Sequence, residues 1–296
     1  MNKKRILICG AGSIGIFLGT LLSSKGNDVL LFGKRKLKSI GEEIIIKGRK
    51  YKLPEKIYSL PKNEKFDFVL ITTKLYDLGK MVNMISRNKI KTKILASIQN
   101  GLVDDSIYSK FLNHNRVIPV TVFSGVQLLK NKLKTNSTDM GWKTEYSKKG
   151  KQLSKLISSI GIKCMAEKKL DSFRAEKTIV NSCLNGLSAI EKKPFCKLFS
   201  DKKIEERILK LFEECYNILV KRYKLENAGI IRKRMYKNWR RMNHYSSTYQ
   251  DVVSNRNNEI DFFNGYIVRL GRRFNMKNEE NESLLRDFRK LVKNKI

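Results

Sequence analysis

Three glycines at a strand-to-helix turn constrain the fold of this chain more than any other feature. The apolar run Arg5–Cys9 is typical of a short buried strand, and apolar residues recur at helical spacing from Ser13 onward. The turn between them follows the pattern GxGxxG, with Gly10, Ala11, Gly12, Ser13, Ile14 and Gly15 in order. Gly26 ends the predicted helix, and Asp28–Phe32 is a second apolar strand. Strand, turn, helix and strand within about 30 residues predict a βαβ unit.

The spacing of these glycines fits a dinucleotide site. Gly10 permits the tight turn, Gly12 lets the backbone approach a pyrophosphate at the helix N-terminus, and Gly15 lets the helix pack close to the sheet. An acidic residue after the second strand would accept a hydrogen bond from the ribose of NAD, but Lys34 and Arg35 stand there instead. Because these bases would pair with a 2′-phosphate, we predict NADP(H). The competing interpretation is that both belong to a general excess of Lys.

Further apolar stretches predict a larger sheet in the first half of the chain. Phe66–Thr72 and Lys93–Ser97 are typical of buried strands, and helical stretches fall between the strands and after Asp104. Strands that alternate with helices indicate a parallel, doubly wound sheet. We expect residues 117–146 to be β-rich and to form a less regular or antiparallel edge.

The pattern changes near residue 168. Beyond it we find no convincing strand, and four long amphipathic helices are predicted at Ser172–Ile190, Ile204–Tyr223, Ile260–Phe274 and Glu279–Lys293. The expected fold class is therefore α/β. It comprises an N-terminal Rossmann-type doubly wound parallel sheet at residues 1–168 and a C-terminal all-helical domain at residues 169–296.

Composition narrows the function classes. The 296 residues include 62 Lys and Arg against 28 Asp and Glu, a formal net charge of +34. Such a charge suits a protein that binds nucleic acid or a membrane surface. The lysines are spread along the chain rather than gathered in one block, however, which favours a compositional background. We therefore expect no specific nucleic-acid partner.

Cysteine and histidine usage argues against a disulfide framework and a metal site. The five cysteines form no CxxC pair, and there are only two histidines. An N-terminal apolar run after several bases resembles a secretory signal, but glycines interrupt it and no cleavage site follows. No stretch reaches the roughly 18 apolar residues of a membrane span. These observations favour a protein of the reducing cytoplasm, with no membrane partner.

Several short motifs along the whole chain form one combination. The first half contains the GAGSIG turn, the basic residue after the second strand, Thr73-Lys74 and Gln99-Asn100-Gly101. The helical half contains Glu176-Lys177-x-x-x-Asn181-x-x-x-Asn185, Ser246-Ser247-x-x-Gln250-Asp251 and Glu259-Ile260-Asp261-x-x-Asn264-Gly265. With this combination, which is far more specific than GxGxxG alone, the chain resembles the ketopantoate reductases (2-dehydropantoate 2-reductases) from end to end. The resemblance implies reduction of 2-dehydropantoate to (R)-pantoate with NADPH, a step towards pantothenate and coenzyme A.

The resemblance also implies a role for individual residues. Lys177 would be the proton donor, and Glu259 would help to position Lys177 or the nicotinamide ribose. The substrate would be bound by Asn100, Asn181, Asn185 and Ser247. The cofactor would be bound by the six residues of the turn, by Lys34 and Arg35, by Lys74 at its anionic end, by Asn100 between nicotinamide and substrate, by the backbone of Gly125, and by Glu259.

Physical chemistry supports the helical part of this site. Lys177, Asn181 and Asn185 are four residues apart, so they form one stripe on a helix among apolar neighbours. Buried polar groups without partners cost about 1–3 kcal/mol each, and a ligand with a carboxylate and a carbonyl would satisfy them. A lysine ammonium can also stabilise the negative charge that hydride transfer builds on a ketone oxygen. The competing interpretation is a solvent-facing polar stripe.

Two departures leave the substrate open. Phe195 stands near the position where the family often has a substrate-binding Asn, and Gly186 stands where Pro is common. A related NADPH-dependent reductase of another branched 2-oxo acid is therefore a second hypothesis. A third is a cationic nucleic-acid-binding protein on a nucleotide-binding scaffold, and a fourth is a catalytically inactive NADP sensor. The sequence is compatible with either a monomer or a homodimer.

Overall fold

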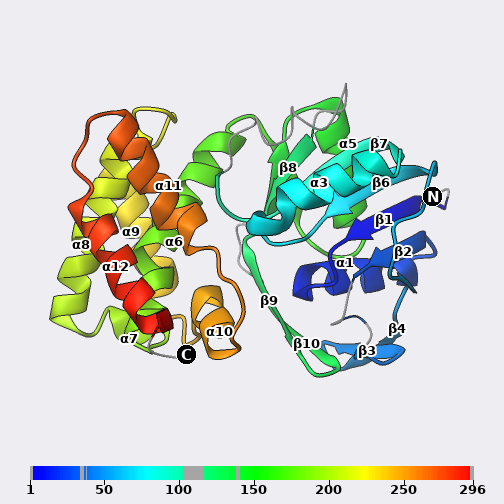
Figure 1. The fold of residues 1–296 in the computed structure, drawn as a ribbon, viewed down its shortest axis with the longest axis horizontal. Coiled ribbons are helices and arrows are strands. Elements are labelled where there is room, and N and C mark those ends of the chain that lie inside the picture. Colours follow the sequence, from blue (N-terminus) through cyan, green and yellow to red (C-terminus); the bar gives the residue numbers. More distant parts are fainter. Residues whose placement is uncertain (1–2, 34–36, 38, 103–116, 138–140, 294–296) are drawn as a thin grey trace. The chain divides into compact units, whose positions relative to one another are not determined.

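The chain folds into two compact units. The computed structural model describes residues 3–33, 37, 39–102, 117–137 and 141–293. The first unit comprises Met1–Asn100 and Asp104–Leu170, and the second comprises Gly101–Val103 and Asp171–Ile296. Figure 1 colours the chain from blue at its N-terminus to red at its C-terminus, so that each unit can be followed by itself. The helical stretch expected after Asp104 lies outside the described residues.

The first unit is built on an eight-stranded sheet with the order β12-β11-β8-β7-β6-β1-β2-β5 (Figure 1). Its strands are β1 (Arg5–Cys9), β2 (Asp28–Phe32), β5 (Glu55–Ile57), β6 (Lys65–Ile71), β7 (Lys91–Ile98), β8 (Val117–Thr121), β11 (Trp142–Glu145) and β12 (Cys164–Glu167). All neighbours pair in parallel except β11 and β8, which are antiparallel. The parallel sheet and its antiparallel edge are therefore confirmed.

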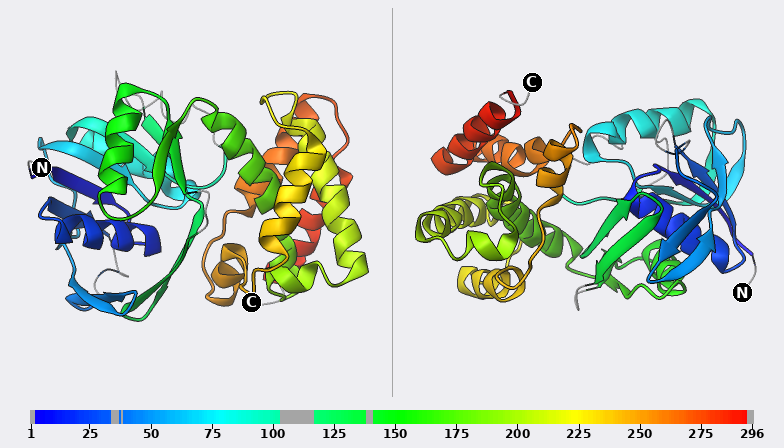
Figure 2. Two further views of the ribbon diagram at one scale, coloured as in Figure 1. Left: turned by 180° about the vertical axis from the view of Figure 1, so that it is seen from behind. Right: turned by 90° about the horizontal axis from the view of Figure 1, so that it is seen from below.

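Helices cover this sheet on both faces. The chain runs from β1 through α1 (Ser13–Ser24) to β2 on one side, and from β6 through η1 (Leu75–Asp77) and α3 (Leu78–Arg87) to β7 on the other. Because such crossovers are right-handed, opposite directions of travel place α1 and α3 on opposite faces, as Figure 2 shows in blue and cyan. The strand order thus reverses between β1 and β6, and ligands bind at such reversals in open α/β sheets. Helix α5 (Lys148–Ser158) precedes β12.

A second sheet in this unit was not predicted. It has the order β4-β3-β10-β9 and consists of β3 (Glu43–Ile46), β4 (Arg49–Lys52), β9 (Ser124–Leu129) and β10 (Lys132–Ser137). The hairpin β9–β10 pairs with β3 in parallel, across a long stretch of sequence. Strand β4 is four residues long and mostly exposed, so it lacks the alternation of apolar and polar residues that reveals a half-buried strand.

The second unit is entirely helical in its described part. Its helices are α6 (Leu170–Ile190), α7 (Phe195–Leu198), α8 (Lys202–Leu219), α9 (Ala228–Trp239), α10 (Ser247–Val253), α11 (Ile260–Arg273) and α12 (Glu279–Lys293). Its hydrophobic core draws on α6, α8, α11 and α12, and also contains Leu102. The four long helices were predicted to within a few residues at each end.

Helices α9 and α10 were not predicted. Helix α9 is rich in Arg and Lys and buries only Ile231 and Met235, so its apolar stripe is too thin to recognise. Helix α10 is seven residues long and starts at a cap, where the Ser246 hydroxyl accepts a hydrogen bond from the Tyr249 amide. Caps of this kind stabilise a helix too short to show periodicity.

Gly15 packs directly against the turn before it, and we expect Gly15→Ala to destabilise the first unit strongly. An added Cβ would lie 1.8 Å from the Gly10 carbonyl oxygen and 2.6 Å from Thr72 Oγ1. Relieving this overlap must move backbone, so the free energy of unfolding should fall by about 2 kcal/mol or more. Urea unfolding followed by circular dichroism measures the loss. Gly12→Ala is the control, because no atom lies within 4 Å of its added Cβ. Equal stability of the two variants would contradict this account.

Candidate active site

The turn after β1 lies at the reversal of strand order and is locked to the end of β6. Gly10 has a φ of +126°, and a Cβ there would lie 2.8 Å from the Thr73 amide nitrogen. The Thr72 hydroxyl donates to the Gly10 carbonyl oxygen at 2.8 Å, and the Thr72 amide donates to Cys9. Only glycine combines this backbone conformation with such a close approach. Glycine is therefore required at Gly10 for the turn and at Gly15 for the close approach of α1 to it.

Helix α1 begins directly at this turn with its first amides uncapped by side chains. Gly12 occupies the N-cap position, where no side chain accepts a hydrogen bond and the space around an added Cβ is open. Ala11 is buried, whereas Ser13 and Ile14 keep part of their surface accessible. The Ser13 hydroxyl accepts a hydrogen bond from the Leu128 amide of β9 at 3.2 Å. Free amides and the helix dipole make this terminus suitable for an anionic group.

The residues expected to select the dinucleotide, Lys34 and Arg35, lie outside the described residues. Gly33, just before them, was missed by sequence reasoning. A Cβ at Gly33 would lie 2.4 Å from the Ala11 Cβ, so glycine lets the chain leave β2 close beside the turn.

The ends of β6 and β7 form the other side of this reversal. Gln99 joins them, because its Nε2 donates to the Thr73 carbonyl oxygen at 2.6 Å and its Oε1 accepts from the Ser97 hydroxyl at 2.7 Å. Thr73 Oγ1 and Asn100 Oδ1 are both buried, and neither has a hydrogen-bond partner within the described part of the chain. Lys74 follows as the residue before η1. Orphaned polar atoms at a strand-order reversal fit a polar ligand.

Gly125 lies on β9, opposite Asn136 of β10, and is exposed. The same strand reaches the glycine-rich turn three residues later, through the bond from Leu128 to Ser13. The structure therefore places Gly125 on a strand that contacts the turn.

Helix α6 carries the second set of predicted residues. From residue 175 to residue 189 every residue is buried except Lys177 and Asn181, which are partly accessible. Asn185, one turn further, is 7% exposed. Lys177 and Asn181 are therefore the accessible residues of an otherwise buried stretch of α6, with Asn185 buried one turn further along, which excludes a broad solvent-facing surface. This arrangement is typical of a binding site lined by few polar groups.

Burial changes the acid–base behaviour of Lys177. It lowers the pKa of the Lys177 ammonium from 10.5 to about 7, because a charged group loses hydration in this environment. A lysine with such a pKa exchanges its proton readily near neutral pH, which suits a general acid or base.

The neighbouring acid Glu176 has a packing role that the sequence did not reveal. Its Oε2 lies 3.2 Å from Arg234 Nη1 of α9, and the side chain is buried. Burial raises the pKa of the Glu176 carboxyl, and the Arg234 guanidinium acts in the opposite direction. Glu176 and Lys177 therefore lie on different faces of α6, as consecutive residues of a helix do.

Ser247 is positioned by the serine before it. Ser246 is 1% exposed, and its hydroxyl donates to the Asn185 carbonyl oxygen at 3.0 Å. The Ser246 amide also donates to the Ser188 hydroxyl at 3.1 Å. These bonds hold the start of α10 against α6 and leave Ser247 exposed at the first helical position. The structure thus brings Ser247 close to Asn185 in space.

Glu259 is the residue just before α11 and is 9% exposed. At this position the dipole of α11 favours a negative charge. Lys177, Asn181, Asn185, Ser247 and Glu259 all belong to the helical unit, whereas the glycine-rich turn, Lys74, Asn100 and Gly125 belong to the sheet unit.

The two departures from the family pattern have packing explanations. Phe195 is 5% exposed, lies in the helical core and contacts the His244 ring edge-on at 5.1 Å between centroids. At Gly186 an added Cβ would lie 2.6 Å from Leu284 Cδ2, so glycine lets α12 approach α6. Neither observation indicates a changed substrate contact.

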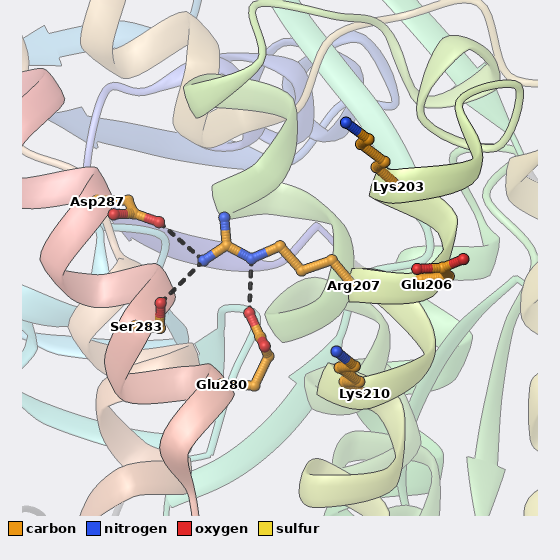
Figure 3. A pocket seen from close by; sticks show the side chains of 7 residues that line it. All are labelled: Lys203, Glu206, Arg207, Lys210, Glu280, Ser283 and Asp287. Atoms are coloured by element: carbon orange, nitrogen blue, oxygen red, sulfur yellow. Dashed lines mark hydrogen bonds and ion pairs between the residues drawn. The ribbon is translucent and has the colours of Figure 1, made fainter.

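A pocket in the helical unit contains none of the predicted residues. It is lined by Lys203, Glu206, Arg207, Lys210, Glu280, Ser283 and Asp287, all on α8 and α12 (Figure 3). The Arg207 guanidinium contacts Glu280 at 2.6 Å and Asp287 at 2.8 Å. This charged groove is explained by the ion pairs that join the two helices.

Metal-ligand clusters and membrane-spanning helices are both absent from the part of the chain that the structure describes. Among the described residues, no group of three or more His, Cys, Asp or Glu side chains could hold a metal ion. In the same part of the chain, no helix is both long and apolar enough to cross a membrane.

Comparison with known proteins covers both units. Residues 6–143 match the family described as ketopantoate reductase PanE/ApbA, and residues 169–291 match its C-terminal domain. The chain is 22% identical to the 2-dehydropantoate 2-reductase of Archaeoglobus fulgidus, over 96% of this chain and 97% of that one.

Solved structures share the whole fold. A PanE/ApbA family ketopantoate reductase from Ralstonia eutropha superposes with a TM-score of 0.86 at 21% identity, over 98% of both chains. D-mandelate dehydrogenase, solved with NADH and anilino(oxo)acetate, gives 0.83 at 21% identity over 98% of both chains. A dimeric ketopantoate reductase from Staphylococcus aureus gives 0.78 at 16% identity, over 98% of this chain and 99% of that one. The chain belongs to the ketopantoate reductase PanE/ApbA family of oxidoreductases.

Proposed function

We propose that this protein reduces the keto group of 2-dehydropantoate to a hydroxyl group with NADPH, giving (R)-pantoate for pantothenate and coenzyme A synthesis. The observation that carries the proposal is the stripe of Lys177, Asn181 and Asn185 on a largely buried stretch of α6. A small anionic ligand with a carboxylate and a keto oxygen would satisfy this stripe. Names of curated relatives at 22–25% identity support the same substrate.

The proton step follows from the chemistry of Lys177. NADPH, when bound, supplies a hydride to the keto carbon, and the keto oxygen must then take up a proton. The Lys177 ammonium would donate that proton and become a neutral amine, which solvent reprotonates. Its pKa of about 7 makes the donation easier than it would be for an ordinary lysine. Hydrogen bonds from Asn181, Asn185 and Ser247 would hold the substrate while this happens.

Two features of the sheet unit support the proposed NADP(H) site. The uncapped N-terminus of α1 and the open space at Gly12 would receive the pyrophosphate, together with Ala11, Ser13 and Ile14. We assign the 2′-phosphate to Lys34 and Arg35, another anionic group to Lys74, and backbone contacts to Gly125. Asn100 would contact cofactor and substrate, and Glu259 would position Lys177 or the nicotinamide ribose.

A related 2-oxo acid is the second candidate substrate. It is favoured by the likeness in fold to D-mandelate dehydrogenase and by the low identity to the curated relatives. We further propose domains at residues 1–168 and 169–296, a cytoplasmic location and a monomer or homodimer, the latter as named for the Staphylococcus aureus relative.

A panel of 2-oxo acids tests the substrate. NADPH oxidation at 340 nm should show the highest kcat/KM for 2-dehydropantoate, beside phenylglyoxylate and 2-oxoisovalerate, because the polar stripe would also bond a substrate hydroxyl. A higher value for another acid would select the second candidate. Folded protein that turns over none of them would refute the reductase proposal.

The pH dependence of the reaction tests Lys177. Reduction needs the ammonium form, so log kcat/KM for reduction should fall with a slope near −1 as pH rises above about 7. Oxidation of pantoate needs the neutral amine, so its kcat/KM should rise with pH and level off above the same value. Lys177→Ala should lower kcat by ~10²–10⁴ and leave NADPH binding largely intact.

Lys177→Arg is the matched variant for this profile. Arginine stays protonated throughout the range, so any residual reduction should lose the decline above pH 7. A flat profile for the parent protein, or near-normal turnover by Lys177→Ala, would remove Lys177 from the proton-donor role.

Cofactor choice is tested at the bases after β2. Changing Lys34 and Arg35 together to Glu should lower kcat/KM for NADPH at least tenfold and spare NADH, because carboxylates repel a 2′-phosphate. The control changes the exposed Lys52 and Lys62 to Glu, which alters the net charge equally. Equal kcat/KM of the parent protein for NADH and NADPH would refute the assignment.

A further inference from the structure

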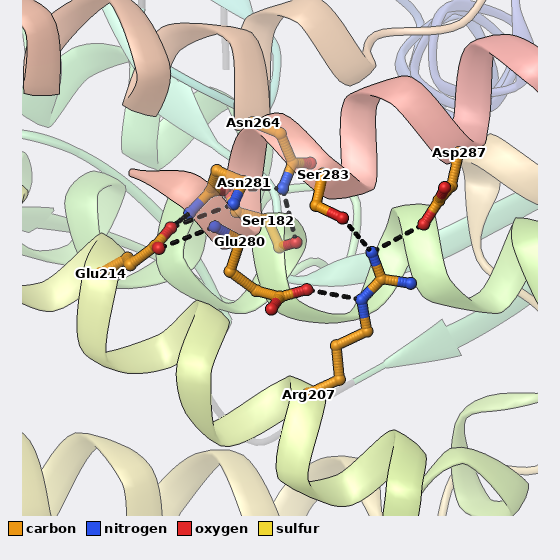
Figure 4. Close-up of polar contacts among 8 residues, drawn as sticks. All are labelled: Ser182, Arg207, Glu214, Asn264, Glu280, Asn281, Ser283 and Asp287. Carbon is orange, nitrogen blue, oxygen red and sulfur yellow. Dashed lines mark hydrogen bonds and ion pairs between the residues drawn. The ribbon is translucent and has the colours of Figure 1, made fainter. Parts of the chain in front are cut away.

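A chain of polar groups runs through the helical unit and ends on the helix that carries Lys177. It joins Glu214 of α8, Asn281 of α12, Asn264 of α11 and Ser182 of α6 (Figure 4). Ser182, Asn264 and Asn281 are each 0% exposed. Four helices that are distant in sequence therefore meet at one buried polar cluster.

Each link of this cluster is a well-formed hydrogen bond. The Asn264 side-chain amide donates to the Ser182 carbonyl oxygen and to Asn281 Oδ1, both at 2.9 Å. The Asn281 side-chain amide donates to Glu214 Oε2 at 2.9 Å. The Glu214 carboxylate also accepts from the amides of Glu280 and Asn281 at the start of α12.

Stability alone is a poor explanation for Asn264. Its Oδ1 and the Ser182 hydroxyl are buried without a hydrogen-bond partner among the residues that the structure describes, and such atoms are costly. The Ser182 carbonyl can also accept a bond from within its own helix. Apolar side chains fill such positions with less desolvation. The Asn264 amide adds a directional contact. A hydrogen bond depends steeply on distance and angle, so it fixes the position of α11 along the axis of α6 more strictly than apolar contacts do.

The bond between Asn264 and Ser182 joins the two helices that carry or follow the proposed site residues. Ser182 is next to Asn181 and three residues before Asn185, while Asn264 is five residues after Glu259 on the facing helix. Close packing of Gly186 with Ile260 and Leu284 lets the same helices approach one another.

We propose that Asn264 is a positioning residue, which sets the register of α6 against α11 and so places Asn181 and Asn185 relative to Glu259. The inference rests on the proposed reductase function. A displacement of about 1 Å at a reacting centre can cost 100-fold in rate, so a small slide of α6 would be visible in turnover.

The test replaces the side-chain amide of Asn264 with an apolar group of similar shape. Asn264→Leu has the same branching without hydrogen bonds, and Asn264→Ala serves as a second variant if Leu prevents folding. Two controls are matched. Ser182→Ala removes a hydroxyl that has no partner among the described residues and keeps the carbonyl that Asn264 contacts. Asn278→Ala removes another buried amide, which donates to Val268 and Met276 and to no described residue of α6.

Steady-state kinetics with NADPH and 2-dehydropantoate gives the first readout. Both Asn264 variants should lower kcat/KM for the oxo acid at least tenfold, while the Kd of NADPH, measured by fluorescence, stays within about threefold. Both controls should stay within twofold of the parent protein. Parent-like kinetics of a folded Asn264 variant, or an equal loss in Asn278→Ala, would overturn the proposal.

Amide hydrogen exchange gives a second readout that needs no activity. Loss of the bond should speed exchange of residues 181–186 at least tenfold in the Asn264 variants and leave them protected in the controls. Unchanged protection in the variants would overturn the register role even if the parent protein turned over no substrate. An inactive parent protein would instead refute the proposed function alone.

Discussion

The helical unit depends on the burial of α6. Most residues of α6 are buried, because helices α8, α9, α11 and α12 contribute side chains to the same hydrophobic core around it. This packing explains why Gly186 is needed beside Leu284 and why Glu176 is paired with Arg234. It also makes Lys177 unusual, because an ammonium on a buried helix loses hydration and its pKa falls to about 7. The packing constraint and the acid–base property thus have the same origin.

The sheet unit depends on a different constraint, which is close approach of backbones. Gly10, Gly15 and Gly33 each stand where a Cβ would overlap a neighbouring atom, so the turn, α1 and the end of β2 converge on a small volume. The convergence leaves the N-terminus of α1 without a side-chain cap at the reversal of strand order. Buried polar atoms of Thr73 and Asn100, unpaired within the described structure, lie at the ends of the adjoining strands. The close approach of the backbones at Gly10, Gly15 and Gly33 and the unpaired polar groups beside them therefore occur at the same reversal of strand order.

Much of the fold was predictable because its signals are local. Strands β1, β2, β6 and β7 are short apolar runs, and the four long helices have apolar residues at regular spacing. The second sheet was not predictable, because β3 pairs with β10, which lies far from it in sequence, and because β4 is largely exposed. The core position of Phe195 was not predictable either, because a side chain's surroundings depend on what packs over it.

The sequence by itself determined the family, the glycine-rich turn and the order of polar residues along α6. These follow from residue types at fixed spacing, which chain geometry converts directly into a turn or a helical stripe. Only the tertiary structure decided that Lys177 and Asn181 are the accessible residues of a buried stretch of α6, that Ser246 holds Ser247 beside Asn185, and that Asn264 bonds to α6. These properties depend on neighbours distant in sequence, because burial and hydrogen-bond partners arise only when separate helices meet.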